Sequence, residues 1–315
     1  MIKLVIGVGT CERPTMFEKS LISFFDINLP KDILVELLII DNSSHKPSKE
    51  LVERLSPKLP LKVHYFLEEK RGLVNMRNRI LKEADKLNAD LLALFDDDEL
   101  ISENWLIDLL STYYTYEADV VPAFTTRLMP KETPDWLIEG GFFGKGGAKD
   151  KTGTLKRSSS TCNVLFNFKK LYHDYKLRFD MRLNFSSGED LLFFNQAYRL
   201  GAKIVWCREG EIQEIFPFSR SNEQWILERS YSRGSSVIQR SFIQEGVVKT
   251  YFFQFFKIIK EIFMYLIRYF NIFLEHDNKK IHTLKTKVLL YFIKAKIKTM
   301  YSKKVYQEYK TIHGN

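Results

Sequence analysis

The sequence is poor in cysteine. Its three cysteines, Cys11, Cys162 and Cys207, lie far apart among 315 residues and in no metal-ligand spacing. This scarcity excludes a disulfide-stabilised scaffold and a zinc ribbon, and it is typical of a protein that folds in a reducing compartment. The first residues also lack the segments and the cleavage site of a secretory signal. We therefore expect a cytoplasmic location.

Internal repeats and low-complexity runs are also absent from the sequence. With 45% hydrophobic and 28% charged residues, the chain can bury a sizeable core and is not a disordered polymer. Its length corresponds to one large domain or two modest ones.

The positive charge of the chain is confined to its C-terminal part. The whole chain has 48 basic and 39 acidic residues, a formal net charge of +9. From residue 249 onward, 14 basic and four acidic side chains give +10, which leaves −1 for residues 1–248. The same 67 residues hold 15 of the 44 aromatic residues. This shift in composition predicts two parts, a domain over residues 1–246 and a helical tail over residues 247–315.

Short apolar segments alternate with helical patterns in the first part. The segments predicted to be strands are residues 4–8, 36–40, 63–67, 91–95, 162–166 and 203–207. Helical spacing is clearest over residues 73–87, and a further helix over residues 190–200 would end at Gly201. This alternation predicts an α/β fold, with helices on both faces of a mostly parallel sheet.

Four acids, Asp96, Asp97, Asp98 and Glu99, directly follow one of these strands. A run of acids is ordinarily a solvated turn, but the buried strand places this run where open α/β sheets bind their ligands. Asp41 ends its own strand in the same sense and should face the same cleft. Adjacent carboxylates repel unless a cation neutralises them, and alternate acids such as Asp96 and Asp98 suit Mg²⁺ or Mn²⁺. We favour a metal site over a solvated turn.

A second acidic pair, Glu189 and Asp190, opens the helix predicted over residues 190–200. Acids at a helix start are most often favourable partners of the helix dipole. The alternative is a general base, which must lie near a reacting hydroxyl. Spacing alone leaves both interpretations open.

Six short motifs occur in a fixed order over residues 1–235. They are Thr10-Cys-Glu-Arg-Pro14, Ile-Ile-Asp41-Asn-Ser-Ser, Arg71-Gly72-Leu-Val-Asn-Met-Arg77-Asn78, Phe95-Asp96-Asp97-Asp98-Glu99, Thr161-Cys162-Asn163-Val and Gly188-Glu189-Asp190. Together they resemble the motifs of family 2 glycosyltransferases, which have the GT-A fold, and especially the bacterial members that build polysaccharides or lipid-linked glycans. Two positions depart from the family pattern, with Met76 where alanine is usual and Cys162 where glycine is common.

The resemblance implies a nucleotide-diphosphate-sugar donor, with a UDP-sugar as the expected type. The donor-binding residues that it implies are Thr10, Glu12, Arg13, Asp41, Gly72, Arg77, Asn78 and Asp97. Asp96 and Asp98 would hold Mn²⁺ or Mg²⁺. Glu214 stands where many relatives have a metal ligand or a leaving-group residue, and a structural salt bridge is the alternative for it.

The resemblance also implies an inverting reaction. Asp190, with Glu189 beside it, would take the proton of an acceptor hydroxyl that attacks the anomeric carbon, and the acceptor would be a glycan or a lipid-linked glycan. Asn163 lies in the acceptor-side motif. Trp136, in the glycine-rich loop predicted over residues 131–160, is a candidate for stacking on a sugar face. Trp225 is a second acceptor candidate, with a place in the core as its alternative.

The tail contains an apolar segment, residues 251–274, which Lys257, Lys260, Glu261 and Arg268 interrupt. A charge in the middle of a membrane span costs about 3 kcal/mol. These charges lie toward one side of a helical projection, which favours an amphipathic helix in the membrane interface. We therefore expect peripheral attachment to the anionic inner surface of the membrane. The alternative is packing on the catalytic domain or on a second subunit, which would make the protein a homo-oligomer.

Three classes of protein remain, and the glycosyltransferase is favoured. A sugar nucleotidyltransferase would need a glycine-rich loop bearing arginine or lysine after the first strand, and residues 7–14 are a poor version of one. A non-catalytic basic module that binds membranes is the other alternative. Nucleic acid is excluded as a partner, because the first part is nearly neutral and the tail is too apolar for a phosphate groove.

Overall fold

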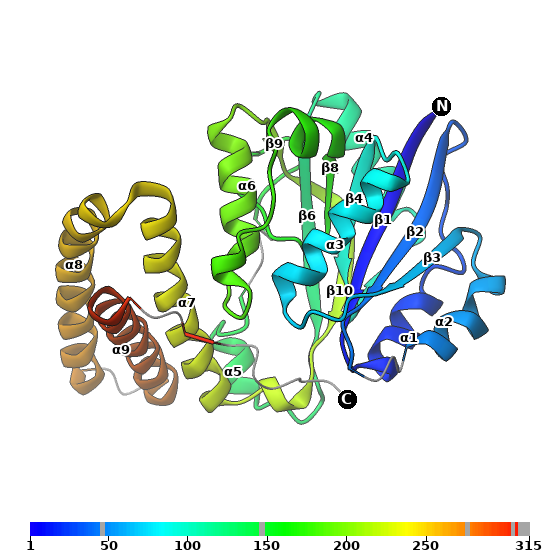
Figure 1. The fold of residues 1–315 in the computed structure, drawn as a ribbon. Helices are drawn as coiled ribbons and strands as arrows, with labels where there is room; N and C mark the ends of the chain where they lie inside the picture. The colour runs from blue at the N-terminus through cyan, green and yellow to red at the C-terminus, as the bar shows by residue number, and fades with distance from the viewer. Residues whose placement is uncertain (45–47, 145–148, 275–277, 304–305, 308–315) are drawn as a thin grey trace.

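The computed structural model describes residues 1–44, 48–144, 149–274, 278–303 and 306–307. Within these residues the centre is a ten-stranded mixed sheet (Figure 1). Its strands are β1 (Ile2–Thr10), β2 (Ile33–Asp41), β3 (Lys62–Leu67), β4 (Leu91–Asp96), β5 (Glu99–Ile101), β6 (Val120–Leu128), β7 (Leu155–Lys156), β8 (Val164–Asn167), β9 (Ile204–Val205) and β10 (Cys207–Ile215). The helices are α1 (Pro14–Ile22), α2 (Lys49–Leu55), α3 (Leu73–Lys86), α4 (Trp105–Thr115), α5 (Asp135–Glu139), α6 (Glu189–Arg199), α7 (Glu223–Glu245), α8 (Val247–Leu274) and α9 (Lys279–Ser302).

The sheet has the order β3-β2-β1-β4-β8-β6-β10-β5. Its first four strands are parallel, and their register sets Thr10 opposite Asp41 and Gly9 opposite Asp96. The carboxyl ends of β1, β2 and β4 therefore meet at one edge of the sheet. Strand β8 runs antiparallel between β4 and β6, so the second half is mixed. The α/β sheet expected from the sequence is confirmed.

Helices cover both faces of the sheet, because alternate strand residues point to opposite sides. In β1, Leu4 and Ile6 join a core cluster with Phe17 of α1 and Trp105 of α4. Val5 joins the opposite cluster, which includes Ile80 of α3 and Phe193 of α6. The two clusters hold the site-bearing edge of the sheet in place.

The last three long helices, α7, α8 and α9, form a bundle beside the sheet (Figure 1). Helix α7 packs on α9 through small side chains, and Ser230 Oγ donates a 2.8 Å hydrogen bond to the carbonyl of Val288. Helix α8 is tied to α9 by Lys296, which is 1% exposed and whose Nζ lies 2.8 and 2.9 Å from the two carboxylate oxygens of Glu261. The tail predicted from composition is thus helical, and its inner side has a packing partner in α7.

Replacing Gly234 of α7 with alanine should loosen this bundle. A Cβ at this position would clash with the carbonyl oxygen of Phe292 in α9. We expect the free energy of unfolding to fall by about 1–3 kcal/mol, measured by urea titration. Gln224→Ala, at an exposed position of the same helix, is the control and should change it by less than about 0.5 kcal/mol. Equal effects of the two variants would contradict close α7–α9 packing.

Candidate active site

An acidic cluster of Asp96, Asp97 and Asp98 follows β4 at the edge where the parallel strands end. Thr10, the last residue of β1, donates a 2.9 Å hydrogen bond from Oγ1 to Asp97 Oδ2. Arg13 forms ion pairs with both Asp97 and Asp98, and its Nη1 lies 2.8 Å from Asp98 Oδ2. The parallel register of β1 and β4 brings these groups together.

Arg220 is a member of this site that the sequence did not indicate. It ends a short 3-10 helix, Phe218–Arg220, after β10, and its Nη1 lies 3.8 Å from Asp98 Oδ2. No motif marks it, because its approach to Asp98 depends on the pairing of β10 with β5 and β6.

Two carboxylates of the acidic cluster, those of Asp96 and Asp97, have raised pKa values. Burial raises the pKa of Asp97 to about 6, against the lowering effect of Arg13. Desolvation by the surrounding protein raises the pKa of Asp96 to about 7. The negative charges of Asp98 and Asp97 add to this rise, while Arg77 opposes it. The side chain of Asp96 is nevertheless 43% exposed, against 8% for Asp98. Asp96 is therefore the carboxylate of the cluster that a ligand reaches most directly.

Glu99 is the buried neighbour of this cluster. Its Oε2 accepts a 2.7 Å hydrogen bond from the backbone N–H of Asp96. Burial and the charge of Asp96 raise the pKa of Glu99 well above its usual range. Glu214 lies opposite Glu99 in the β5–β10 register, and its Oε2 accepts a 2.7 Å hydrogen bond from Arg127 Nε. Glu214 thus forms a salt bridge with Arg127, the arrangement given above as the alternative to a role as metal ligand or leaving-group residue.

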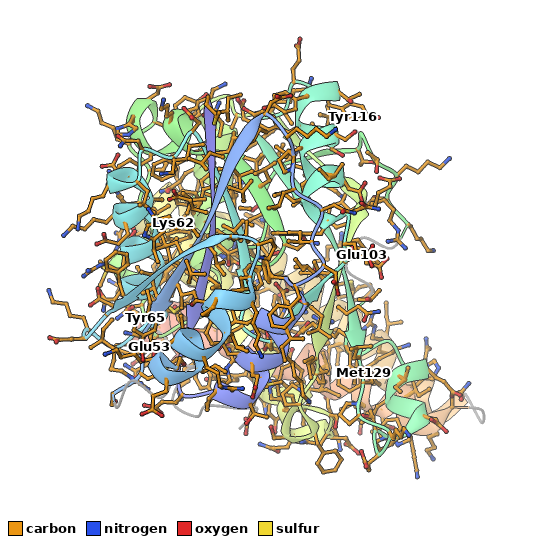
Figure 2. The ribbon with its side chains drawn as sticks, turned by 90° about the vertical axis from the view of Figure 1, so that its right-hand side faces the viewer. Glu53, Lys62, Tyr65, Glu103, Tyr116 and Met129 are labelled. Carbon is orange, nitrogen blue, oxygen red and sulfur yellow. The ribbon has the colours of Figure 1, made fainter. Side chains whose placement is uncertain are left out.

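Asp41 reaches the same edge but is fully buried. Its Oδ1 accepts the backbone N–H of Ser43 at 2.9 Å, and its Oδ2 accepts the hydroxyl of Tyr65 at 2.7 Å. Tyr65 lies on the edge strand β3 (Figure 2). Glu12 forms an ion pair with Arg71, in which Oε1 lies 2.8 Å from Arg71 Nη1. Asp41 and Glu12 thus brace the loops at this edge of the sheet.

The turn at Gly72 is held by two asparagines. Its N–H donates to Asn42 Oδ1 at 2.9 Å, and its φ of +125° suits glycine. Asn184 Oδ1 accepts the N–H groups of Val74 and Asn75 at 3.0 and 3.2 Å, which satisfies the start of α3. Sequence reasoning missed Asn184 because its partners lie about 110 residues away.

Asn78 anchors a loop in this structure. Its side-chain amide donates to the carbonyl of Phe179 at 2.9 Å and accepts the N–H of the same residue at 3.0 Å. Both ends of the amide are therefore engaged with the protein. The preceding motif residue, Arg77, pairs instead with Glu189.

Arg77 and Glu189 form a buried ion pair between α3 and α6, with relative exposures of 7% and 2%. The Nη2 of Arg77 lies 3.9 Å from Asp96 Oδ1. The second carboxylate oxygen of Glu189 has no hydrogen-bond partner among the described residues. Arg77 therefore joins the acidic cluster to the start of α6.

Asp190 lies in the first turn of α6 and is half-buried. Its Oδ1 accepts the N–H of Leu191 at 2.6 Å. The preceding Gly188 has a φ of +93°, and a Cβ there would clash with Ser236 Oγ of α7. Close packing on α7 thus fixes the turn that carries the two acids.

The three predicted acceptor residues lie in different surroundings. Asn163 is fully buried, accepts Trp105 Nε1 at 2.7 Å and donates to the carbonyls of Phe124 and Gly210 at 2.7 and 2.8 Å. Its amide is therefore used inside the core. Trp136 and Trp225 are partly buried around one small apolar cluster. Within the predicted loop 131–160, residues 145–148 lie outside the described part of the chain.

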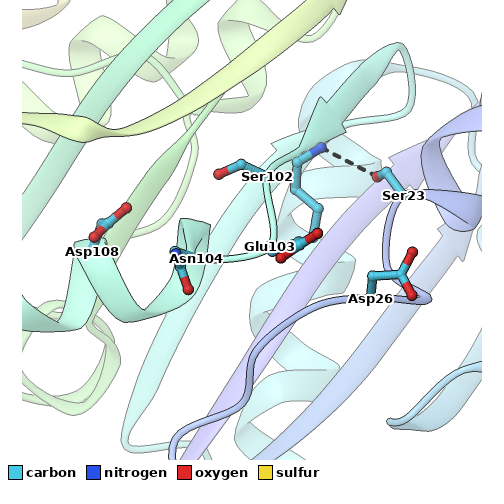
Figure 3. Close-up of a pocket in the computed structure, with 7 residues that line it drawn as sticks. Ser23, Asp26, Ser102, Glu103, Asn104 and Asp108 are labelled. Atoms are coloured by element: carbon cyan, nitrogen blue, oxygen red, sulfur yellow. Dashed lines mark hydrogen bonds between the residues drawn. The ribbon is translucent and has the colours of Figure 1, made fainter.

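A separate shallow pocket of about 630 Å³ lies between the end of α1 and the start of α4. Its lining includes Ser23, Asp26 and Asp108, and Ser23 Oγ accepts the N–H of Ile101 at 3.2 Å (Figure 3). It contains no residue predicted to bind the donor, the metal or the acceptor. The described residues also contain no group of three histidine, cysteine or acidic side chains arranged as a metal site.

Solved structures share this fold. The mannosyltransferase PcManGT from Pyrobaculum calidifontis, in complex with GDP-Man and Mn²⁺, has a TM-score of 0.62 at 14% identity, over 96% of this chain and 88% of that one. S. aureus TarS 1–349, in complex with UDP-GlcNAc, has a TM-score of 0.54 at 15% identity, over 100% and 95%. The chain spans 55% of a longer TarS chain. These likenesses define the class of protein, one with the GT-A fold.

The sequence itself gives the family. The Glycosyl transferase family 2 sequence model matches residues 6–173. The succinoglycan biosynthesis protein ExoM of Rhizobium meliloti (strain 1021) is 30% identical over 231 residues, which are 73% of this chain and 72% of that protein. This chain therefore belongs to glycosyltransferase family 2 and is a glycosyltransferase. The nucleotidyltransferase and the non-catalytic module are set aside.

Proposed function

We propose that the enzyme transfers a sugar from a UDP-sugar to a hydroxyl of a glycan or lipid-linked acceptor, with inversion at the anomeric carbon. The observation that carries this proposal is the buried Arg77–Glu189 pair, with Arg77 3.9 Å from Asp96. Arg77 thereby contacts both the acidic cluster and Glu189, the first residue of α6, and Asp190 is the next residue of that helix. A donor site and a proton acceptor are then adjacent, as a direct displacement requires.

The donor would bind along the ends of β1, β2 and β4. The loop from Thr10 to Arg13 and the buried Asp41 support the nucleoside side. Arg71 and Arg77 supply cations for the diphosphate, and arginine is suited to such groups because it donates in a planar fork. The complexes of PcManGT with GDP-Man and of TarS with UDP-GlcNAc support a nucleotide sugar as donor.

We place a divalent cation beside Asp96, the exposed carboxylate of the acidic cluster. Mg²⁺ and Mn²⁺ need few protein oxygens and complete their shells with water and phosphate. Asp96, with its exposed carboxylate, and Asp98 would supply those oxygens, while Arg127 holds Glu214. When bound, the cation would neutralise charge on the leaving diphosphate.

Asp190 would act as the general base. Its carboxylate takes the proton of the acceptor hydroxyl while the hydroxyl oxygen forms a bond to the anomeric carbon. The bond from that carbon to the diphosphate oxygen breaks, and UDP leaves with the electron pair. One displacement inverts the configuration at this carbon.

Removing divalent cations should suppress turnover. We expect UDP release from UDP-sugars with Mn²⁺ to fall at least about tenfold in excess EDTA and to recover when Mn²⁺ is restored, because the leaving diphosphate loses its counter-ion. A coupled assay for UDP measures both. Equal rates with and without EDTA would remove the metal from the proposal. The absence of UDP release and of any thermal shift with UDP would contradict the choice of donor.

We also propose that α8 attaches the enzyme to the anionic cytoplasmic surface of a membrane. None of the helices in the described residues is long and apolar enough to cross a bilayer. Helix α8 exposes a broad apolar face, made up of Val248, Phe252, Phe255, Phe256, Ile259, Phe263, Leu266, Ile267 and Phe270. Lys249, Lys257, Lys260 and Arg268 are exposed on the same helix, a pattern typical of interfacial helices.

Phe256→Glu should reduce co-sedimentation with phosphatidylglycerol vesicles at least about fivefold, because it sets a charge in the apolar face. Leu155→Glu, at an exposed leucine of β7, is the matched control and should leave vesicle binding unchanged. If wild-type protein ignores the vesicles and elutes as a dimer, the face is instead a contact between two subunits.

A further inference from the structure

A second pocket, of about 430 Å³, lies between α6, α7 and the first turns of α8. Three cations line it, one from each helix: Arg199, Arg240 and Lys257. Glu245 is the acid in the lining, and it forms an ion pair with Arg199. Arg240 and Lys257 have no carboxylate within 4 Å among the described residues. The pocket lining therefore has an excess of positive charge, with three cations and one acid.

Gln254 gives a second sign that the pocket is incomplete. Its side chain lines the pocket and is 4% exposed, and its Oε1 is buried without a hydrogen-bond partner among the described residues. A buried amide end without a partner costs about 1–3 kcal/mol. A ligand hydroxyl that donates a hydrogen bond to this oxygen would remove the cost.

The pocket lies next to the candidate base. A Cβ at Gly188 would lie 3.0 Å from Arg240 Nε, so the guanidinium of this pocket residue packs on the turn that leads into Asp190. Burial lowers the pKa of Arg240, the charge of Asp190 opposes this, and Arg233 adds to the lowering. An anion in the pocket would stabilise the charged form of Arg240.

The pocket is also continuous with the apolar face of α8. Phe253 lines the pocket and is 53% exposed. Its ring lies 5.5 Å from that of Phe252, which in turn lies 5.3 Å from that of Phe256. A ligand with an anionic group in the pocket can therefore lay an apolar chain along these rings.

We infer that this pocket binds the phosphate or diphosphate group of an amphiphilic acceptor, whose apolar chain lies on α8 and whose sugar end reaches Asp190. The role of the sugar end rests on the proposed function. The anion site itself rests on the excess of cations in the lining and on the ring contacts. Helix α8 would then form one wall of the acceptor site in addition to attaching the enzyme to the membrane.

Geranylgeranyl diphosphate is a soluble probe with both chemical features. Its binding to the full chain is measured by calorimetry with saturating UDP, which occupies the donor site. We expect Lys257→Gln to weaken binding about tenfold, because a charge-assisted contact is lost. Lys260→Gln, the same change one turn along and outside the pocket, should leave it within about twofold.

Further titrations distinguish the possible causes of probe binding. Inorganic pyrophosphate should bind more weakly than the probe and keep its sensitivity to Lys257→Gln, whereas the uncharged geranylgeraniol should lose that sensitivity. Equal effects of Lys257→Gln and Lys260→Gln on the probe would overturn the pocket in favour of diffuse surface charge. Loss of probe binding when UDP is added would assign it to the donor site. UDP release by the wild type tests the proposed function separately, since the titration needs no turnover.

Discussion

Replacing Asp190 with asparagine lowers the rate of sugar transfer by about 10²–10⁴-fold, the range expected when a general base is lost. Asparagine has nearly the same size and still accepts the N–H of Leu191, so the start of α6 keeps its shape. It cannot take a proton from the acceptor hydroxyl. Donor binding, measured as the Kd for UDP, should change by less than about twofold, since Asp190 acts on the acceptor side.

The matched control is Asp135→Asn, which changes an exposed acid in the first turn of α5. It should leave transfer unchanged, and so separates the chemistry of Asp190 from a helix-dipole effect. An active Asp190→Asn enzyme would remove Asp190 as the base. Glu189 is the less suitable base, because one of its oxygens is already paired with Arg77.

Arg77→Met lowers the free energy of unfolding by about 3–5 kcal/mol, because it leaves the carboxylate of Glu189 buried without its cation. Methionine fills much of the same volume, so the loss reports charge more than packing. Urea titration measures it. The activity should fall as well, since Arg77 also lies 3.9 Å from Asp96.

Two further variants test whether the stability lost in Arg77→Met comes from the unpaired charge of Glu189. Arg77→Met combined with Glu189→Gln should recover most of the lost stability, because no unpaired charge remains, and it should not recover activity. Arg54→Met breaks an exposed pair with Glu18 and should cost less than about 1 kcal/mol. A cost for Arg77→Met as small as that of Arg54→Met would contradict a buried pair.

Much of the first half of the fold was predictable, because most of its strands are short, continuous apolar segments between amphipathic helices. The strand predicted over residues 91–95 is β4, Leu91–Asp96, and the helix predicted over residues 73–87 is α3, Leu73–Lys86. The direction of β8 was not predictable. A strand buried on both faces has the same apolar pattern whether it runs parallel or antiparallel to its neighbours.

The residues predicted for the site come together at one edge of the sheet, but their side chains are engaged in different ways. Thr10, Asp41 and Asp96 meet as expected because each ends a parallel strand. Asn78 and Asn163, in contrast, use their amides on buried backbone groups. A sequence motif does not distinguish an amide that faces a ligand from one that satisfies the core, since both positions require the same side chain.

The sequence by itself determined the family, the α/β class, the position of the acidic cluster and the separation of charge into a nearly neutral part and a basic, aromatic tail. These follow from local periodicity and composition. Only the tertiary structure decided which charges meet: Arg220 with Asp98, Arg77 with Glu189, and Lys296 with Glu261. Each pair joins separate elements of the chain, so its geometry depends on the strand order and on how the helices pack.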